Sequence, residues 1–147
     1  MIRGRIAKFL RRRGHGIHSP FVYSLVRTIY ENRKAEHGGV CRELINIGLT
    51  PRIAFHLEQT ILHCSYHNWG VDTISNLDEL DMLICHTTKG EDLDRAVEMG
   101  VKSGATIAII LSKGESYDTS NHNSTVIEAK GYTLLFNNGL PKQRFKI

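Results

Sequence analysis

The stretch LDMLICHTTKGEDLDRAVEMGVKSGATIAIIL, residues 80–111, decides the fold of this chain. Its first six residues form a short apolar segment, residues 90–104 carry apolar side chains at helical spacing, and residues 105–111 are almost entirely apolar. Short apolar runs between turn residues predict strands, and a strand without polar alternation is typical of a parallel sheet covered on both faces. The stretch therefore predicts a strand, a helix and a second strand that lies in the same parallel sheet.

The preceding segments continue this alternation. ELINIGL, residues 43–49, predicts a buried strand. TPRIAFHLEQTIL, residues 50–62, predicts a helix with Thr50 as its N-cap and Pro51 in its first turn. WGVDTI, residues 69–74, predicts a further strand. We expect all of these segments to belong to one α/β domain.

The segments after residue 111 predict a loop and two closing strands. Lys113–Ser124 is polar and predicts the loop, while GYTLLF (131–136) and QRFKI (143–147) predict a closing pair. Strands that alternate with helices favour a mostly parallel sheet with ligands at the carboxyl ends of its strands. We therefore predict an α/β fold, a Rossmann-like three-layer αβα sandwich with an N-terminal helical extension.

Charge is distributed unevenly along the chain. Residues 1–42 hold ten Lys and Arg side chains against two acids, whereas residues 43–147 hold nine against thirteen. The first segment predicts a basic amphipathic helix and, after GHG, a second helix that begins at Ser19 and Pro20. We therefore expect a basic helical extension over 1–42 that packs on a core domain over 43–147.

Length and composition narrow the class of protein. A chain of 147 residues with 41% hydrophobic residues is long enough for one domain with a core. Its longest apolar run, Ile107–Leu111, is far shorter than the ~20 residues that span a bilayer. The three cysteines are odd in number and far apart, which disfavours a disulfide framework. A cytoplasmic protein with reduced thiols is the expectation.

Two segments of the chain resemble a known family. GHGIHSPFVYSLV, residues 14–26, is similar to the HGxHSPFV element of a bacterial (Bacteroidetes) group of class I S-adenosylmethionine-dependent methyltransferases. GYTLLFNNGLPKQRFKI, residues 131–147, resembles the closing strands of that group, which end in KQxF. The middle of the chain matches mainly in the order of its elements. The resemblance implies a Rossmann-like fold and a site for S-adenosylmethionine.

The cofactor loop that the resemblance implies is altered in this chain. The family pattern resembles LEIGxxxGIS, and the chain has INIGLTPRIA at residues 45–54. Gly48 is kept, whereas Asn46 stands in place of the acid and Arg52 in place of the second glycine. Because bare backbone at that loop lets a cofactor approach, the resemblance implies that the Arg52 side chain fills the cofactor's space.

The ends of three later strands also depart from the family pattern. The acid that would bind the ribose falls at Ser75, with Asp72 nearby but on the other face of a regular strand. Cys85 stands in place of another acid, and Leu111 and Ser112 stand where a pair of aspartates is expected. The resemblance therefore implies that the acidic groups of the site are lost.

The resemblance also implies a shortened domain. The segment between Ile74 and Leu80 is too short for a strand–helix–strand unit, which implies that one βα unit is deleted. The cofactor-binding residues carried over form a vestigial pocket of Gly48, Thr50, Arg52 and Asp72. We assign no catalytic residue and expect no cofactor, unless an intact pocket binds S-adenosylmethionine.

Histidines and cysteines offer an alternative chemistry. The cluster His56, His63, Cys64 and His67 contains two histidines at i and i+4, which is a spacing that suits zinc on a helix face. Packed or surface histidines are the favoured interpretation, and we predict no metal site. Cys85 and the adjacent His86 would point to opposite faces of a strand, which disfavours a catalytic thiol.

The basic N-terminal segment is a candidate anion site. Its donors are Arg11, Arg12, Arg13, His15 and His18, beside two glycines. The favoured alternative is a linker between two helices. Together with Arg3, Arg5 and Lys8, the same helix could bind RNA or an anionic membrane surface.

Three functions stay open at this point. The favoured one is a degenerate, catalytically inactive methyltransferase-like domain, a pseudoenzyme that serves as a binding or interaction module. The second is an active small S-adenosylmethionine-dependent methyltransferase with an atypical pocket. The third is an adaptor that binds RNA or a membrane surface through its N-terminus. A homodimer is also predicted, because a deleted βα unit would leave an apolar stripe exposed.

Overall fold

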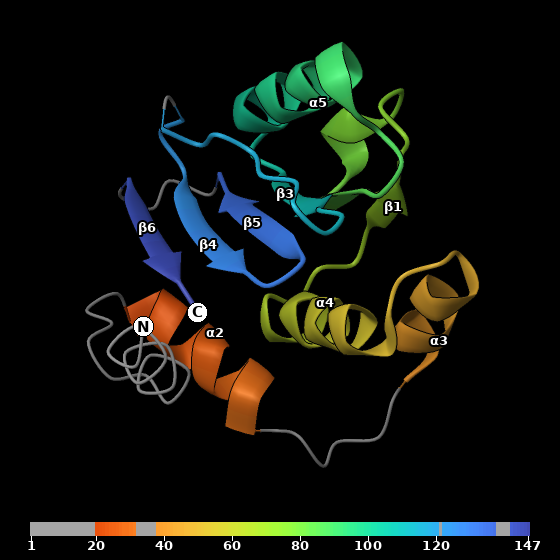
Figure 1. Ribbon diagram of the computed structural model, residues 1–147, viewed down its shortest axis with the longest axis vertical. Helices are drawn as coiled ribbons and strands as arrows, with labels where there is room; N and C mark the ends of the chain where they lie inside the picture. The colour runs from red at the N-terminus through yellow and green to blue at the C-terminus, as the bar shows by residue number, and fades with distance from the viewer. Residues whose placement is uncertain (1–19, 32–37, 121, 138–141) are drawn as a thin grey trace. The chain divides into compact units, whose positions relative to one another are not determined.

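The computed structural model describes residues 20–31, 38–120, 122–137 and 142–147 (Figure 1). The chain divides into two compact units, one that runs to Ser65 and includes Lys146–Ile147, and one that comprises Tyr66–Phe145. The division therefore falls at Ser65, whereas the sequence analysis places it after residue 42. The predicted first basic helix and the N-cap at Ser19 lie outside the described residues.

The first unit contains three described helices, α2 (Pro20–Glu31), α3 (Gly39–Asn46) and α4 (Pro51–His63). The α4 helix contacts both α2 and α3. The start of α4 is as predicted, because the Thr50 hydroxyl accepts a hydrogen bond from the backbone N–H of Ile53 at 3.3 Å and Pro51 occupies the first turn. The α2 helix buries an apolar stripe, whose members are Val22, Leu25, Val26 and Ile29.

The predicted strand over residues 43–49 is wrong, because α3 occupies most of that segment. Cys41 and Leu44 are buried three residues apart while Arg42 and Glu43 are exposed, which is a helical and not an alternating pattern. The first turn of α3 is stabilised from outside the segment. The buried carboxylate of Glu58 accepts hydrogen bonds from the N–H of Gly38 at 2.9 Å and of Cys41 at 2.8 Å.

The second unit contains a six-stranded sheet with the strand order β1-β2-β3-β5-β4-β6. The strands are β1 (Trp69–Val71), β2 (Met82–Cys85), β3 (Thr106–Ile110), β4 (Thr125–Ala129), β5 (Tyr132–Phe136) and β6 (Gln143–Lys146). β1, β2 and β3 pair in parallel, and β5 pairs antiparallel with both β3 and β4. β3 and β4 therefore run in the same direction, and β5 is reversed between them.

The α/β class and the mostly parallel sheet are confirmed, with β5 antiparallel to both of its neighbours. The predicted pairing of 131–136 with 143–147 is wrong, because β4 lies between β5 and β6 in the sheet. β4 was not expected as a strand. It forms a hairpin with β5 through a tight turn in which Gly131 has a φ of 87°, a left-handed backbone that glycine adopts without strain.

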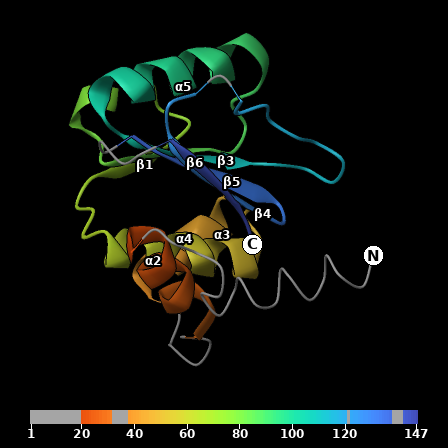
Figure 2. The ribbon, with the colours of Figure 1, turned by 90° about the vertical axis from the view of Figure 1, so that its left-hand side faces the viewer.

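The helix α5 (Gly90–Ser103) covers one face of the sheet, as Figure 2 shows. The core between them includes Leu93, Ala96 and Val97 of the helix and Leu83, Cys85, Ile107, Ile109, Val126 and Leu135 of the strands. At Gly100 a side chain would overlap the side chain of Ile107, so that this glycine permits the close contact between helix and sheet. The three-layer Rossmann-like arrangement stays a prediction.

The connection between β1 and β2 is short, as the sequence predicted. Residues 72–81 join these two parallel neighbours with a single 3₁₀ turn, Leu77–Glu79, in place of an α-helix. Among the described residues, no helix combines the length and the apolar character needed to cross a membrane.

Candidate functional site

Asp72 lies at the carboxyl end of β1, at the edge where parallel sheets usually bind ligands. Its carboxylate accepts hydrogen bonds from the backbone N–H groups of His86 at 2.8 Å, Thr87 at 3.1 Å and Thr88 at 3.1 Å. The hydroxyls of Thr87 and Thr88 each donate to it at 2.8 Å. Because a carboxylate offers about four lone-pair sites, these donors use its acceptor capacity.

The environment of Asp72 favours the charged carboxylate. Partial burial opposes the charge, but the hydrogen bonds from the hydroxyls and N–H groups of Thr88 and Thr87 outweigh it and hold the pKa of Asp72 below its ordinary value. The backbone of Asp72 is left-handed, with a φ of 54°, a conformation that aspartate tolerates better than most residues. The Asp72 carboxylate therefore stabilises the loop that follows β2.

The neighbouring polar groups of this edge are also engaged within the chain. The ammonium group of Lys89 donates to the carbonyl oxygen of Ile110 at 2.8 Å and lies 3.6 Å from the carboxylate of Glu115. Glu115 in turn accepts a hydrogen bond from the N–H of Ser112 at 2.8 Å. The carboxyl ends of β1, β2 and β3 are therefore joined by contacts among their own loops.

The thiol of Cys85 is unsuited to nucleophilic chemistry. Its side chain is fully buried, and this burial, together with the negative charge of Asp72, raises the pKa of the thiol to about 12. At neutral pH the thiol is therefore protonated. This observation agrees with the sequence analysis, which disfavours Cys85 and His86 as a catalytic pair.

The residues carried over from the methyltransferase resemblance are divided between the two units. Gly48 and Thr50 lie between α3 and α4, and Arg52 is an exposed residue in the first turn of α4. Asp72 belongs to the second unit. Because a helix and not a strand precedes Gly48, the interpretation of residues 45–54 as a strand–loop–helix cofactor site is wrong. The inference that Arg52 fills such a site falls with it.

The candidate metal ligands of α4 are held by other contacts. His56 is buried and lies edge-to-face against the ring of Tyr30, with ring centroids 5.2 Å apart. Nδ1 of His63 lies within hydrogen-bond distance of the Thr28 hydroxyl, at 3.1 Å. Within the part of the chain that the structure describes, no three His, Cys, Asp or Glu side chains gather as a metal site would require. The candidate anion-binding residues, Arg11, Arg12, Arg13, His15 and His18, lie outside the described residues.

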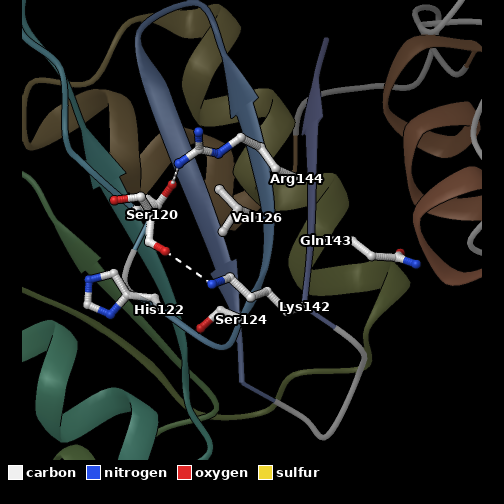
Figure 3. A pocket seen from close by; sticks show the side chains of 8 residues that line it. Ser120, His122, Ser124, Val126, Lys142, Gln143 and Arg144 are labelled. Atoms are coloured by element: carbon white, nitrogen blue, oxygen red, sulfur yellow. Dashed lines mark hydrogen bonds between the residues drawn. The ribbon is translucent and has the colours of Figure 1, made fainter.

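A cavity of about 360 Å³ lies in the second unit, beside β4 and the start of β6. Its lining residues are Thr119, Ser120, His122, Ser124, Val126, Lys142, Gln143 and Arg144 (Figure 3). None of these lining side chains is acidic, and two of them are permanently cationic. Figure 3 shows Lys142 and Arg144 on the side of the serines and His122, with the Gln143 side chain pointing away.

The two cations at the rim of this cavity are anchored to the loop that precedes β4. The Arg144 guanidinium donates to the Thr119 hydroxyl at 2.5 Å, and its Nε lies 3.5 Å from the carboxylate of Glu128. Nζ of Lys142 donates to the carbonyl oxygen of Ser120 at 3.1 Å. These contacts hold both side chains beside the cavity.

No pattern in the sequence indicated this cavity. Residues 113–124 were predicted as a loop and 143–147 as a closing strand, and both predictions hold for most of those residues. The available signal was KQR at 142–144, because residues two apart in an extended segment lie on the same face. The sequence pattern does not show what this face of β6 packs beside, because the position of β6 next to β4 is a property of the sheet.

Comparisons with protein-family models, with curated proteins and with solved structures find no match to this chain. The resemblance of residues 14–26 and 131–147 to methyltransferases therefore stays a prediction from those residues alone.

Proposed function

We propose that this chain is a degenerate methyltransferase-like domain that does not use S-adenosylmethionine and serves as a binding module. The observation that carries this proposal is the engagement of Asp72. An acid at the carboxyl end of a parallel strand can accept hydrogen bonds from the ribose hydroxyls of a nucleoside only if its lone pairs are available. Here the donors of Thr87, Thr88 and His86 occupy them.

Two further features support the loss of a nucleoside site. Lys89 and Glu115 join the loops that follow β2 and β3, at the same edge of the sheet. The ten residues between β1 and β2 contain no α-helix, which agrees with the inferred loss of one βα unit. Side-chain contacts that join these loops engage polar groups at the edge where a cofactor would bind.

Titration calorimetry with S-adenosylhomocysteine tests this proposal. We expect no saturable heat, which corresponds to a dissociation constant weaker than about 1 mM. A micromolar constant would refute the proposal and favour an active small methyltransferase. Transfer of a labelled methyl group from S-adenosylmethionine to cell-extract acceptors, with Gly48→Trp as the comparison variant, would then show whether the pocket lies near Gly48.

A homodimer is part of the same proposal. β1 is an edge strand of three residues, on the side of the sheet where the deleted unit is inferred. Unpaired backbone groups of an edge strand can pair with a second copy. Light scattering on the full chain is expected to give twice the mass of one chain, and the mass of a single chain would exclude the dimer.

A further inference from the structure

We propose that the cavity beside β4 and β6 binds a small phosphate-bearing anion through Lys142, Arg144, Ser120 and His122. This site is distinct from the carboxyl edge at Asp72, and neither inference depends on the other. The cavity volume of about 360 Å³ lies near the lower end of the range for small-molecule sites, which suits a phosphate group with a small substituent.

The charge of the lining favours an anion. Lys142 and Arg144 line the cavity, and among the described residues Lys142 forms no ion pair. Glu128 contacts Nε of Arg144 from outside the set of lining residues. The carboxylate of Asp118 also interacts with Arg144 and His122, so that the excess positive charge of the described lining comes mainly from Lys142. An anion in the cavity is attracted by that charge.

The donors that remain fit a phosphate group better than a carboxylate. A guanidinium group carries five N–H donors, and Arg144 directs one to Thr119 and one towards Glu128. An ammonium group carries three, and Lys142 directs one to the carbonyl oxygen of Ser120. Several N–H donors of Arg144 and Lys142 therefore remain beside the cavity. A phosphate group offers more acceptor oxygens to these donors than a carboxylate does.

Contacts within the chain position several residues that line the cavity. The His122 ring stacks on Tyr117 with centroids 6.0 Å apart, and the N–H of Ser120 donates to the carboxylate of Asp118 at 2.9 Å. The buried Ser124 hydroxyl is hydrogen-bonded to the side-chain oxygen of Asn137, so that it shapes the floor and is not counted among the ligand donors. A site with positioned donors loses less entropy when it binds.

The binding test uses inorganic phosphate as the probe and the full chain at constant ionic strength. We expect saturable binding by calorimetry, with amide shifts in nitrogen-15 spectra at Ser120 and His122. Lys142→Ala and Arg144→Ala should each weaken binding about tenfold, because each removes a charged hydrogen-bond donor. Lys102→Ala, which removes the same charge from α5, should leave binding unchanged.

The contrary outcomes are equally defined. Non-saturable binding, or binding that Lys142→Ala and Lys102→Ala weaken equally, would show only general attraction by positive charge and would overturn the proposal. Acetate that competes as well as phosphate would overturn the assignment to phosphate. An RNA oligonucleotide that binds through Lys142 and Arg144 while inorganic phosphate does not saturate would replace the small anion with a nucleic acid. If Arg144→Ala fails to fold, the exposed Lys142→Ala still decides the question.

Discussion

Two polar regions of the second unit show opposite uses of charge. At the carboxyl ends of β1 and β2, the carboxylate of Asp72 is surrounded by donors from its own chain. Beside β4 and β6, Lys142 makes one hydrogen bond and Arg144 contacts Thr119 and Glu128, and both cations keep further donors beside a cavity. The comparison teaches that a charged residue at a sheet edge is a binding candidate only when the chain leaves its hydrogen-bonding capacity unfilled.

The largest predicted effect is the loss of the Asp72 carboxylate. Asp72→Ala should lower the free energy of unfolding by about 3 kcal/mol, because it leaves the donors of Thr87 and Thr88 without their acceptor and puts alanine in a left-handed backbone. Urea denaturation measures this change. Asp78→Ala, at an exposed position of the same connection, should change stability by less than about 0.5 kcal/mol. Equal changes in stability for the two variants would show that the hydrogen bonds of Asp72 do not stabilise the loop.

Lowering the pH should also reduce the stability that the Asp72 carboxylate contributes, and by less than the substitution does. Because the pKa of Asp72 in the folded chain is below its ordinary value, its contribution is complete above the unfolded value of about 3.9 and is lost as the pH falls through the folded value. Urea midpoints measured between pH 6 and pH 2, at intervals of about one unit, should therefore fall more steeply for the wild type than for Asp72→Asn. Parallel profiles would indicate that Asp72 does not hold the loop.

A smaller effect is expected from one hydroxyl donor. Thr88→Val removes a hydrogen bond to the Asp72 carboxylate while nearly preserving shape, and should cost about 1 kcal/mol of unfolding free energy. In the Asp72→Ala background the same substitution should cost much less, because the acceptor is already absent. A double-mutant cycle by urea denaturation measures the coupling, and purely additive effects would argue against it.

The smallest stability effect is predicted at the cavity. Lys142 is exposed and donates one hydrogen bond to a backbone carbonyl, so that Lys142→Ala should change the free energy of unfolding by less than about 0.5 kcal/mol. The same variant should weaken phosphate binding about tenfold. A variant that keeps its stability but binds phosphate more weakly would indicate that Lys142 serves the ligand. A loss of unfolding free energy above about 1 kcal/mol would instead indicate that Lys142 stabilises the fold.

Local patterns predicted several elements well. The strand, helix and strand within residues 80–111 were confirmed as β2, α5 and β3, because apolar periodicity and turn residues are properties of the segment itself. The N-cap at Thr50 was confirmed for the same reason. The strand predicted over residues 43–49 was wrong because a short apolar run fits either a strand or a helix. The carboxylate of Glu58, which lies further along the chain, stabilises the helix.

The sites depended on contacts that no local pattern contains. Asp72 was singled out from the sequence, but its donors lie fourteen to sixteen residues later in the chain, in the loop after the adjacent strand β2. The cavity joins a loop before β4 with the face of β6, and β4 itself was not predicted. Asp72 and His86 of the first region were therefore named from the sequence without the hydrogen bond that joins them, and the second region was missed.

By itself, the sequence determined the α/β class, the helix boundaries that carry caps and the strands that are apolar throughout, because these follow from side-chain period and backbone preference within a few residues. Tertiary structure alone decided that β5 runs antiparallel between β3 and β4. It also decided that donors of the same chain occupy the acceptor sites of the Asp72 carboxylate, and that Lys142 and Arg144 line a cavity. Those outcomes depend on which distant donors and acceptors meet, and a hydrogen bond between distant residues leaves no period in the sequence.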